Sequence, residues 1–467
     1  MLAFAFRNFE KKGFYMDNKK EFLGTAPIGR LLLKLAIPTV LAQLINMLYN
    51  IVDRIYIGHI ENVGDLALTG VGICMPIIMI VSSFAALVGS GGAPRASIFM
   101  GKGEQENAER TLSNCFSLQL IVSAVITAVL LLWSRDFLMA FGGSENTIEY
   151  AVEYMSIYAL GTVFVQLTLG MNAFISAQGF TKISMASVLI GAVLNIVLDP
   201  IFIFGFGMGV RGAALATIIS QACSCAWVLS FLFGRKTVLR IQRKHLAIKS
   251  NIILPCIALG LAPFIMQSSE SIISMCFNSS LQKYGGDIAV GAMTILSSVM
   301  QFAMLPLQGV AQGAQPILSF NFGAKNRARV KRAFFLLLRV SLCYSALLWC
   351  AVMLFPRAFA GIFTPNEELL GFAARVLPIY FGGMVIFGIQ VACQMTFVSI
   401  GNAKASITVA VVRKFVLLLP LIYIVPLLVS DKTMGVYLAE PIADFIAVTF
   451  TAVLFAFQFK KALGSLE

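Results

Sequence analysis

A line of polar residues runs along an apolar stretch of membrane-spanning length near the start of the chain. Within residues 41–58 the line consists of Gln43, Asn46, Asn50 and Asp53. Their spacing of three, four and three places all of them on one helix face. A carboxylate inside a bilayer-spanning helix costs roughly 2.5–3.5 kcal/mol, so it commonly faces a cavity and marks the route of an ion or substrate. The alternative is that Asp53 pairs with Arg54 or with water at the membrane surface.

A second polar group lies in the apolar stretch 191–207. Asn195 and Asp199 are four apart and share a helix face, and Pro200, which lacks an N–H, leaves a helical carbonyl without its partner. Such oxygens suit a proton or a small hard cation such as Na⁺, and two carboxylates in one apolar pocket can together hold a proton near neutral pH. The alternative is that Asp199 and Pro200 simply end a helix. The predicted cation-coupling site, and the possible Na⁺ site, consists of Asp53, Asn195, Asp199 and Thr217.

Acidic residues also occur in the second half of the chain. A third polar line, spaced three, four and four, consists of Gln267, Glu270, Ser274 and Asn278. Glu270 is a separate candidate for ion coupling, and the alternative is a structural hydrogen bond between spans. In the last apolar stretch Glu440 and Asp444 are four apart; we expect Asp444 to be buried and Glu440 to lie near the outer surface.

A binding cavity for varied apolar ligands would be lined by polar side chains and by flexible methionines. The alternative for any single methionine is packing or lipid contact. The residues predicted to line the substrate cavity are Gln43, Asn46, Asn50, Gln267, Ser274, Asn278, Met300 and Met304.

The composition is that of a polytopic membrane protein. Of the 467 residues, 58% are hydrophobic and 12% charged, whereas soluble domains carry about 25% charged residues. The net charge of +13 resides in the loops, so it indicates membrane topology and not nucleic-acid binding. The nine cysteines form no CxxC pair and the two histidines lie in loops, so we expect no enzyme centre and no cofactor.

Hydropathy predicts an all-α protein with twelve spans. They are placed at 35–57, 66–90, 112–133, 155–175, 183–206, 212–233, 252–281, 288–318, 333–355, 376–399, 406–429 and 434–457. Lys and Arg collect in alternate loops, so those loops and both termini are expected to be cytoplasmic. The opening residues are too short for a signal peptide, and we expect the native start at Met16.

A weak repeat with a period of roughly 220–225 residues relates the two halves of the chain. AIPTVLAQ near Pro38 corresponds to GLAPFIMQ near Pro263, and AQGFTKIS corresponds to SIGNAKAS. This predicts two six-helix bundles around a central cavity, as in an alternating-access transporter. The predicted units are a cytoplasmic segment 1–34, a first lobe 35–233, a linker 234–251, a second lobe 252–459 and a tail 460–467.

The ordered motifs resemble the MATE (multidrug and toxic compound extrusion) family, in its bacterial DinF-like and MepA-like branch. The resemblance covers residues 17–460 and is carried by LGTAPIGRLLLKLAIPTVLAQLINMLYNIVDRIYIG, GKGEQENAERT, AQGFTKISM and LNIVLDPIFIFGFGMGVRGAALAT. It implies a V-shaped pair of six-helix bundles in the bacterial cytoplasmic membrane that exports cationic or amphipathic compounds in exchange for H⁺ or Na⁺.

The resemblance also assigns residues. The first-lobe coupling positions of DinF-like members match Asp53, Asn195, Asp199 and Thr217, and Glu270 matches an acidic position in the seventh span. The aspartate that other members carry in the tenth span is missing around Ile389–Gln390, which favours the first lobe as the coupling site.

The leading hypothesis is therefore a cation-coupled multidrug antiporter that acts as a monomer on small amphipathic molecules in a lipid membrane. A lipid-linked precursor flippase is the alternative, although it would need several intramembrane cations for a pyrophosphate. The candidate cations are Arg54, Arg339, Arg413 and Lys414.

Overall fold

The computed structural model describes residues 19–61 and 63–466, so the expected start at Met16 lies outside the described residues. Within these ranges the chain is helical and contains no strand. A helix satisfies all of its backbone hydrogen bonds internally, which lipid cannot do for it.

The first half of the chain forms a bundle of six long helices preceded by a short one. Its elements are α2 (Lys19–Thr25), α3 (Ile28–Gly58), α4 (Gly64–Gly101), α5 (Gln105–Ala140), α6 (Ile148–Ala177), α7 (Thr181–Pro200), the π-helical turn η1 (Ile201–Gly205) and α8 (Gly209–Phe233). A connecting segment with one 3₁₀ turn, η2 (Arg243–His245), leads to the second half.

The second half is also a bundle, with more interruptions. Its elements are α9 (Ser250–Gly323), α10 (Arg327–Leu354), α11 (Pro356–Gly361), α12 (Glu367–Tyr380), η3 (Phe381–Gly383), α13 (Met384–Ser399), α14 (Ala403–Val411), the π-helical η4 (Val412–Leu418), α15 (Leu419–Leu428) and α16 (Lys432–Gly464).

The prediction of twelve spans is confirmed. The described chain has eleven continuous helical stretches long and apolar enough to cross a membrane, and one of them, α9, holds two spans. The break lies at Gly286, whose φ of 63° is left-handed and favours a residue without a Cβ. Each predicted span falls within these helices to within one residue.

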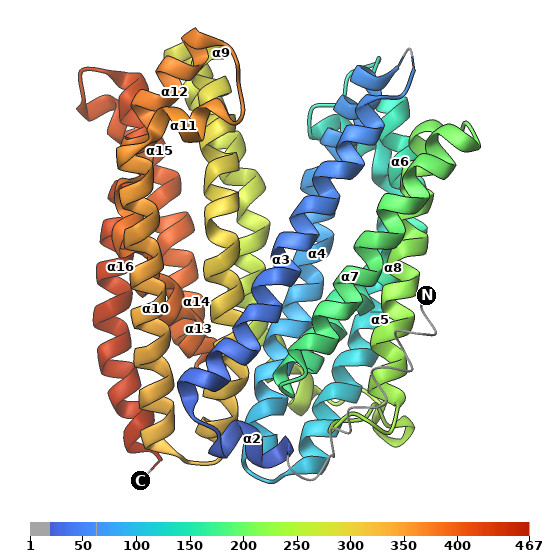
Figure 1. Cartoon of the computed structure of the whole chain (residues 1–467), viewed down its shortest axis with the longest axis vertical. Helices are drawn as coiled ribbons and strands as arrows, with labels where there is room; N and C mark the ends of the chain where they lie inside the picture. Colours follow the sequence, from blue (N-terminus) through green and yellow to red (C-terminus); the bar gives the residue numbers. More distant parts are fainter. Residues whose placement is uncertain (1–18, 62, 467) are drawn as a thin grey trace.

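The two bundles converge at one end of the molecule and diverge at the other (Figure 1). The convergent end carries α2 and the C-terminus, and the break in α9 lies at the divergent end (Figure 1). This arrangement agrees with the V-shaped pair of bundles that the family resemblance implies.

The connecting segment is folded against the first bundle. The side-chain oxygen of Gln178 accepts hydrogen bonds from Thr237 Oγ1, at 2.8 Å, and from the backbone N–H groups of Val238 and Leu239, at 2.9 and 2.8 Å. At its other end, the N–H of Lys249 donates to Asn114 Oδ1 at 2.8 Å. The predicted linker is thus an ordered part of the first bundle's surface.

The bundles meet through close backbone contact between α3 and the second span of α9. Gly309 and Gly313, four residues apart, pack on Val40 and Ala36, and a Cβ at Gly313 would lie 2.5 Å from Ala36 Cα. Thr39 Oγ1 donates a hydrogen bond of 2.6 Å to the carbonyl of Gly309.

A second close contact joins α4 to both spans of α9. A Cβ at Gly260 would overlap the carbonyl oxygen of Leu87, and one at Gly323 would overlap that of Ile98. We call the α3–α9 and α4–α9 contacts together the glycine seam.

Replacing a glycine of the seam should loosen the contact between the bundles. We expect Gly313→Val to destabilise the protein by about 1–3 kcal/mol, because an overpacked interface must separate or distort. The matched control is Gly72→Val in α4, where an added Cβ meets nothing within 4 Å. Thermal unfolding in detergent measures both. Equal melting temperatures for the two variants would show that the seam does not contribute to stability.

Candidate functional site

The first bundle brings two carboxyl groups together between α3 and α7. Asp53 is 5% exposed and Asp199 is fully buried, and the two side chains lie within hydrogen-bonding reach of each other. The reading of Asp53 as a surface residue paired with Arg54 is wrong, because Arg54 points to the exposed side of α3. Asp199 does not end a helix either, since the chain continues helically through Pro200 to Gly205.

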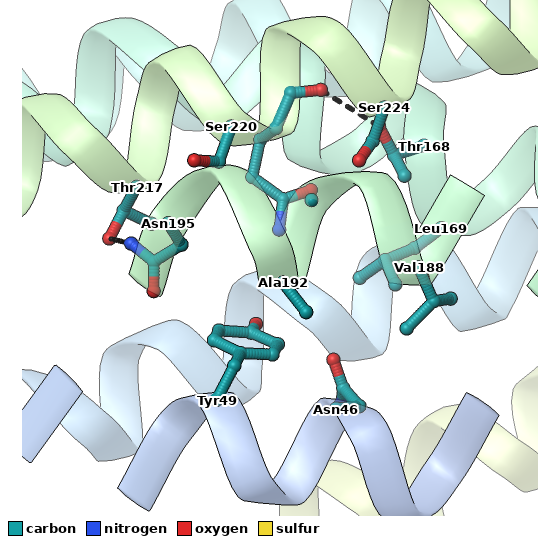
Figure 2. A pocket seen from close by; sticks show the side chains of 12 residues that line it. Asn46, Tyr49, Thr168, Leu169, Val188, Ala192, Asn195, Thr217, Ser220 and Ser224 are labelled. Atoms are coloured by element: carbon teal, nitrogen blue, oxygen red, sulfur yellow. Dashed lines mark hydrogen bonds between the residues drawn. The ribbon is translucent and has the colours of Figure 1, made fainter. Parts of the chain in front are cut away.

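Asn195 and Thr217 complete the group that the sequence predicted. The Asn195 amide donates to Asp199 Oδ1 at 3.1 Å and to Thr217 Oγ1 at 3.4 Å, and Figure 2 shows the second of these bonds. Thr217 comes from α8, so three helices supply the four side chains. We call these residues, with Asp53, the carboxyl site.

Three oxygens of the carboxyl site have no hydrogen-bond partner among the described residues. They are Asp53 Oδ1, Asp199 Oδ2 and Asn195 Oδ1, and all three are buried. A buried acceptor without a partner carries a desolvation penalty of about 1–3 kcal/mol, and more when it is charged. A proton or a small cation would relieve that penalty, so the donor set fits H⁺ or Na⁺.

The carboxyl site adjoins a small cavity of about 30 Å³ between α3, α6, α7 and α8 (Figure 2). Such a volume admits two or three waters, which require about 10–15 Å³ each. Its polar lining includes Asn46, Asn195, Thr217 and Ser220. The cavity can hold the water that accompanies an ion or relays a proton.

Two tyrosines at the carboxyl site were missed by sequence reasoning. Tyr49 lines the small cavity and lies four residues before Asp53, so the helical spacing contained the signal. The Tyr154 hydroxyl, from α6, lies beside Thr217. Nothing in the local sequence around Tyr154 indicated that contact.

The residues predicted to line a substrate cavity fall into two groups. The polar ones occupy accessible faces: Asn46 and Ser274 are exposed, and Gln43 reaches across the seam to donate to Gln312 Oε1 at 3.2 Å. The half-buried polar residues are Gln43, Asn50, Gln267 and Asn278. The methionines Met300 and Met304 are half-buried and pack against the core of the second bundle.

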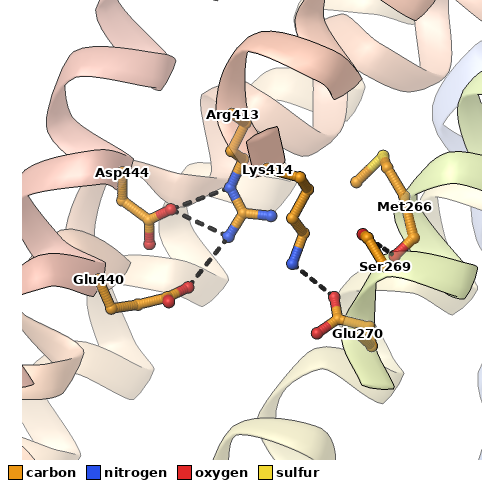
Figure 3. A network of polar contacts seen from close by, with 7 residues as sticks. All are labelled: Met266, Ser269, Glu270, Arg413, Lys414, Glu440 and Asp444. Atoms are coloured by element: carbon orange, nitrogen blue, oxygen red, sulfur yellow. Dashed lines mark hydrogen bonds and ion pairs between the residues drawn. The ribbon is translucent and has the colours of Figure 1, made fainter. Parts of the chain in front are cut away.

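The second bundle contains a network of five charged side chains (Figure 3). Lys414 Nζ lies 2.6 Å from Glu270 Oε1, and an Arg413 Nη lies 2.9 Å from Asp444 Oδ1 and 3.4 Å from Glu440 Oε1. We call these residues the charge network. Four of its side chains are at most 8% exposed, whereas that of Glu270 is 55% exposed.

The charge network bears on two expectations, the surface position of Glu440 and the coupling role of Glu270. Glu440, expected near the outer surface, is buried because Arg413 of η4 supplies its counter-charge. Beside Glu270, the ammonium of Lys414 already takes the position that a coupling cation would occupy. Gln390, where the resemblance expects an aspartate nearby, is buried and uncharged. The coupling role of Glu270 stays a prediction.

Removing the arginine of the charge network should destabilise the fold strongly. We expect Arg413→Met to cost about 3–5 kcal/mol, because it leaves two buried acids without their counter-charge. The control is Arg211→Met, which breaks the exposed pair with Glu153 at 2.7 Å and should cost about 0–1 kcal/mol. Thermal unfolding in detergent compares them. An Arg413 variant as stable as the Arg211 variant would contradict the assignment.

Comparison with known proteins agrees with this architecture. The family model described as MatE matches residues 38–201 and 262–424, one match in each bundle. The curated protein "Multidrug export protein MepA" of Staphylococcus haemolyticus (strain JCSC1435) is 22% identical over 434 residues, covering 92% of this chain and 95% of that protein. Its namesake in Staphylococcus aureus (strain MSSA476) is also 22% identical, with 87% and 89% covered.

Solved structures show the same fold. A crystal structure of MATE in the bent conformation has a TM-score of 0.90 and 22% identity, covering 96% of this chain and 99% of that one. An outward-facing multidrug resistance MATE family transporter of the MOP superfamily has a TM-score of 0.89 and 22% identity, covering 97% and 99%. With both halves of the chain matched by the family model, the protein belongs to the MATE family of membrane transporters.

Proposed function

We propose that this protein is a cation-coupled multidrug efflux antiporter that exports small, often cationic, amphipathic compounds in exchange for H⁺ or Na⁺. The observation that carries the proposal is the carboxyl site, with two adjoining buried acids and three oxygens that lack a partner. The names of the MepA relatives support multidrug export as the task.

Helix α3 offers a physical link between ion and drug. Asn46, Tyr49 and Asp53 lie on the side of α3 that faces the small cavity and the carboxyl site, and Asn46 is also exposed. A cation that binds Asp53 neutralises the repulsion from Asp199, which changes the preferred position of α3 and of the exposed Asn46 that it carries. By reciprocal coupling, drug affinity must then depend on cation occupancy.

The proposed setting is the bacterial cytoplasmic membrane, with both termini inside. The Lys- and Arg-rich loops support this orientation. In it, the convergent end of the two bundles faces the cytoplasm and the divergent end faces outward. The conformation is therefore the one from which a drug would leave and a cation would enter.

The flippase alternative has less support. A pyrophosphate cargo would need several free cations inside the membrane, yet two of the four candidates, Arg413 and Lys414, are paired with acids, which leaves only Arg54 and Arg339. With two bases and three acids, the charge network offers no net positive charge at its formal ionisation.

Transport in proteoliposomes tests the proposal. Efflux of a fluorescent lipophilic cation should follow an imposed pH or Na⁺ gradient, and Asp199→Asn should lower the gradient-driven rate at least about tenfold, because one of the two ion-binding charges is gone. Asp65→Asn, at an exposed position at the start of α4, is the matched control and should transport normally.

Two results would count against the proposal. Wild-type rates in the Asp199 variant would refute the carboxyl site as the coupling site. Cargo movement driven by neither gradient would refute ion coupling and favour the flippase.

A further inference from the structure

A groove of about 780 Å³ lies where the start of α3 meets α10. Residues Pro27, Ile28 and Gly29 form one wall, and a single face of α10 forms the other. The volume falls in the range of about 300–1,000 Å³ that is common for sites that bind small organic molecules. The groove shares no residue with the carboxyl site or with the small cavity beside it.

Three cations line the α10 wall. Lys331, Arg332 and Arg339 are exposed, and within the part of the chain that the structure describes none of them forms an ion pair with a carboxylate. Arg332 and Arg339 are seven residues apart, so a helix aligns them on one face at a separation of about 10 Å. The wall can therefore attract an anionic group at two positions along α10, near Arg332 and near Arg339.

The rest of the groove is apolar. Phe335 is 42% exposed and lies between the two arginines on the same face, next to the half-buried Leu336. Across the groove, Ile28 contributes another apolar side chain. A soluble anion would gain nothing from these side chains, whereas an amphiphile with a negative head would bury its hydrocarbon against them.

The position along the helices matches a membrane interface. Pro27 immediately precedes α3, and Lys331 and Arg332 lie in the first two turns of α10, which is a predicted span. Arg339 starts about 10 Å beyond Arg332 along α10, where a long basic side chain extends back toward the headgroups. Basic pockets between spanning helices on the Lys- and Arg-rich side suit anionic lipid headgroups.

We propose that this groove binds an anionic glycerophospholipid, with the phosphate on Lys331, Arg332 and Arg339 and an acyl chain against Phe335 and Leu336. Because one wall belongs to α3 and the other to α10, the bound lipid bridges the two bundles at their convergent end. It would then stabilise the arrangement in which that end is closed.

Native mass spectrometry of the full chain in mild detergent tests the proposal. With phosphatidylglycerol added, we expect a retained lipid adduct, and with phosphatidylcholine of the same chain length we expect none. The double variant Arg332→Gln/Arg339→Gln should bind phosphatidylglycerol about 30-fold more weakly, from the attraction typical of two basic residues at an anionic membrane surface.

The matched control removes two cations at the same end of the molecule but outside the groove. Lys460→Gln/Lys461→Gln, at exposed positions in the last turns of α16, should retain the adduct. Phe335→Ala keeps every charge and should weaken the adduct through the acyl chain alone. A circular-dichroism spectrum like that of the wild type confirms that each variant folds.

Three outcomes would overturn the proposal. Equal loss in the two double variants would mean that only the net charge matters. Equal retention of phosphatidylcholine would mean that no headgroup is selected. Full competition by glycerol 1-phosphate, which has the phosphate but no chains, would make the groove a site for soluble anions.

Discussion

The structure depends on the glycine seam, where the backbones of α3 and α4 pack directly against the backbone of α9. At Gly260, Gly313 and Gly323 even one added carbon would meet the opposing helix. Between apolar helices in lipid there is little hydrophobic driving force, so association relies on packing and on a few hydrogen bonds. The bond from Thr39 to the Gly309 carbonyl is one of these.

The two bundles share an architecture but differ in their electrostatics. In the first, Asp53 and Asp199 are brought together, and among the described residues no ion pair joins either of them to a base. In the second, Arg413 and Lys414 supply fixed positive charge to every acid of the charge network. Fixed positive charge therefore lies beside the acids of the second bundle, whereas the carboxyl site of the first bundle has three buried oxygens without a partner among the described residues.

Much of the fold could be predicted because membrane insertion is governed by local sequence. A run of about twenty apolar residues predicts a membrane-spanning helix independently of the rest of the chain. Helical periodicity then places polar residues such as Asp53 and Asn46 on particular faces of that helix. The proximity of Asp53 to Asp199 also followed from two polar lines that lipid would not tolerate. Each of these inferences required only the pattern of one helix, or of two helices whose polar faces must both be shielded from lipid.

Interactions between distant helices were harder to predict. The pairing of Lys414 with Glu270 joins residues 144 positions apart, and the pairing of Arg413 with Glu440 turns on how α16 is rotated. The repeat was recognised from short motifs such as AIPTVLAQ and GLAPFIMQ, so it gave no hint that the basic residues of the second half pair with its acids from η4. Tyr154 was missed for the same reason, since its contact with Thr217 crosses from α6 to α8.

The connecting segment has a mechanical consequence. Its backbone is held by Gln178 at one end and Asn114 at the other, both of which belong to the first bundle. The connecting segment is therefore fixed to the first bundle and is not a flexible linker between the two. The covalent connection between the two bundles therefore begins after Lys249, where the chain leaves this hydrogen-bonded segment and enters α9.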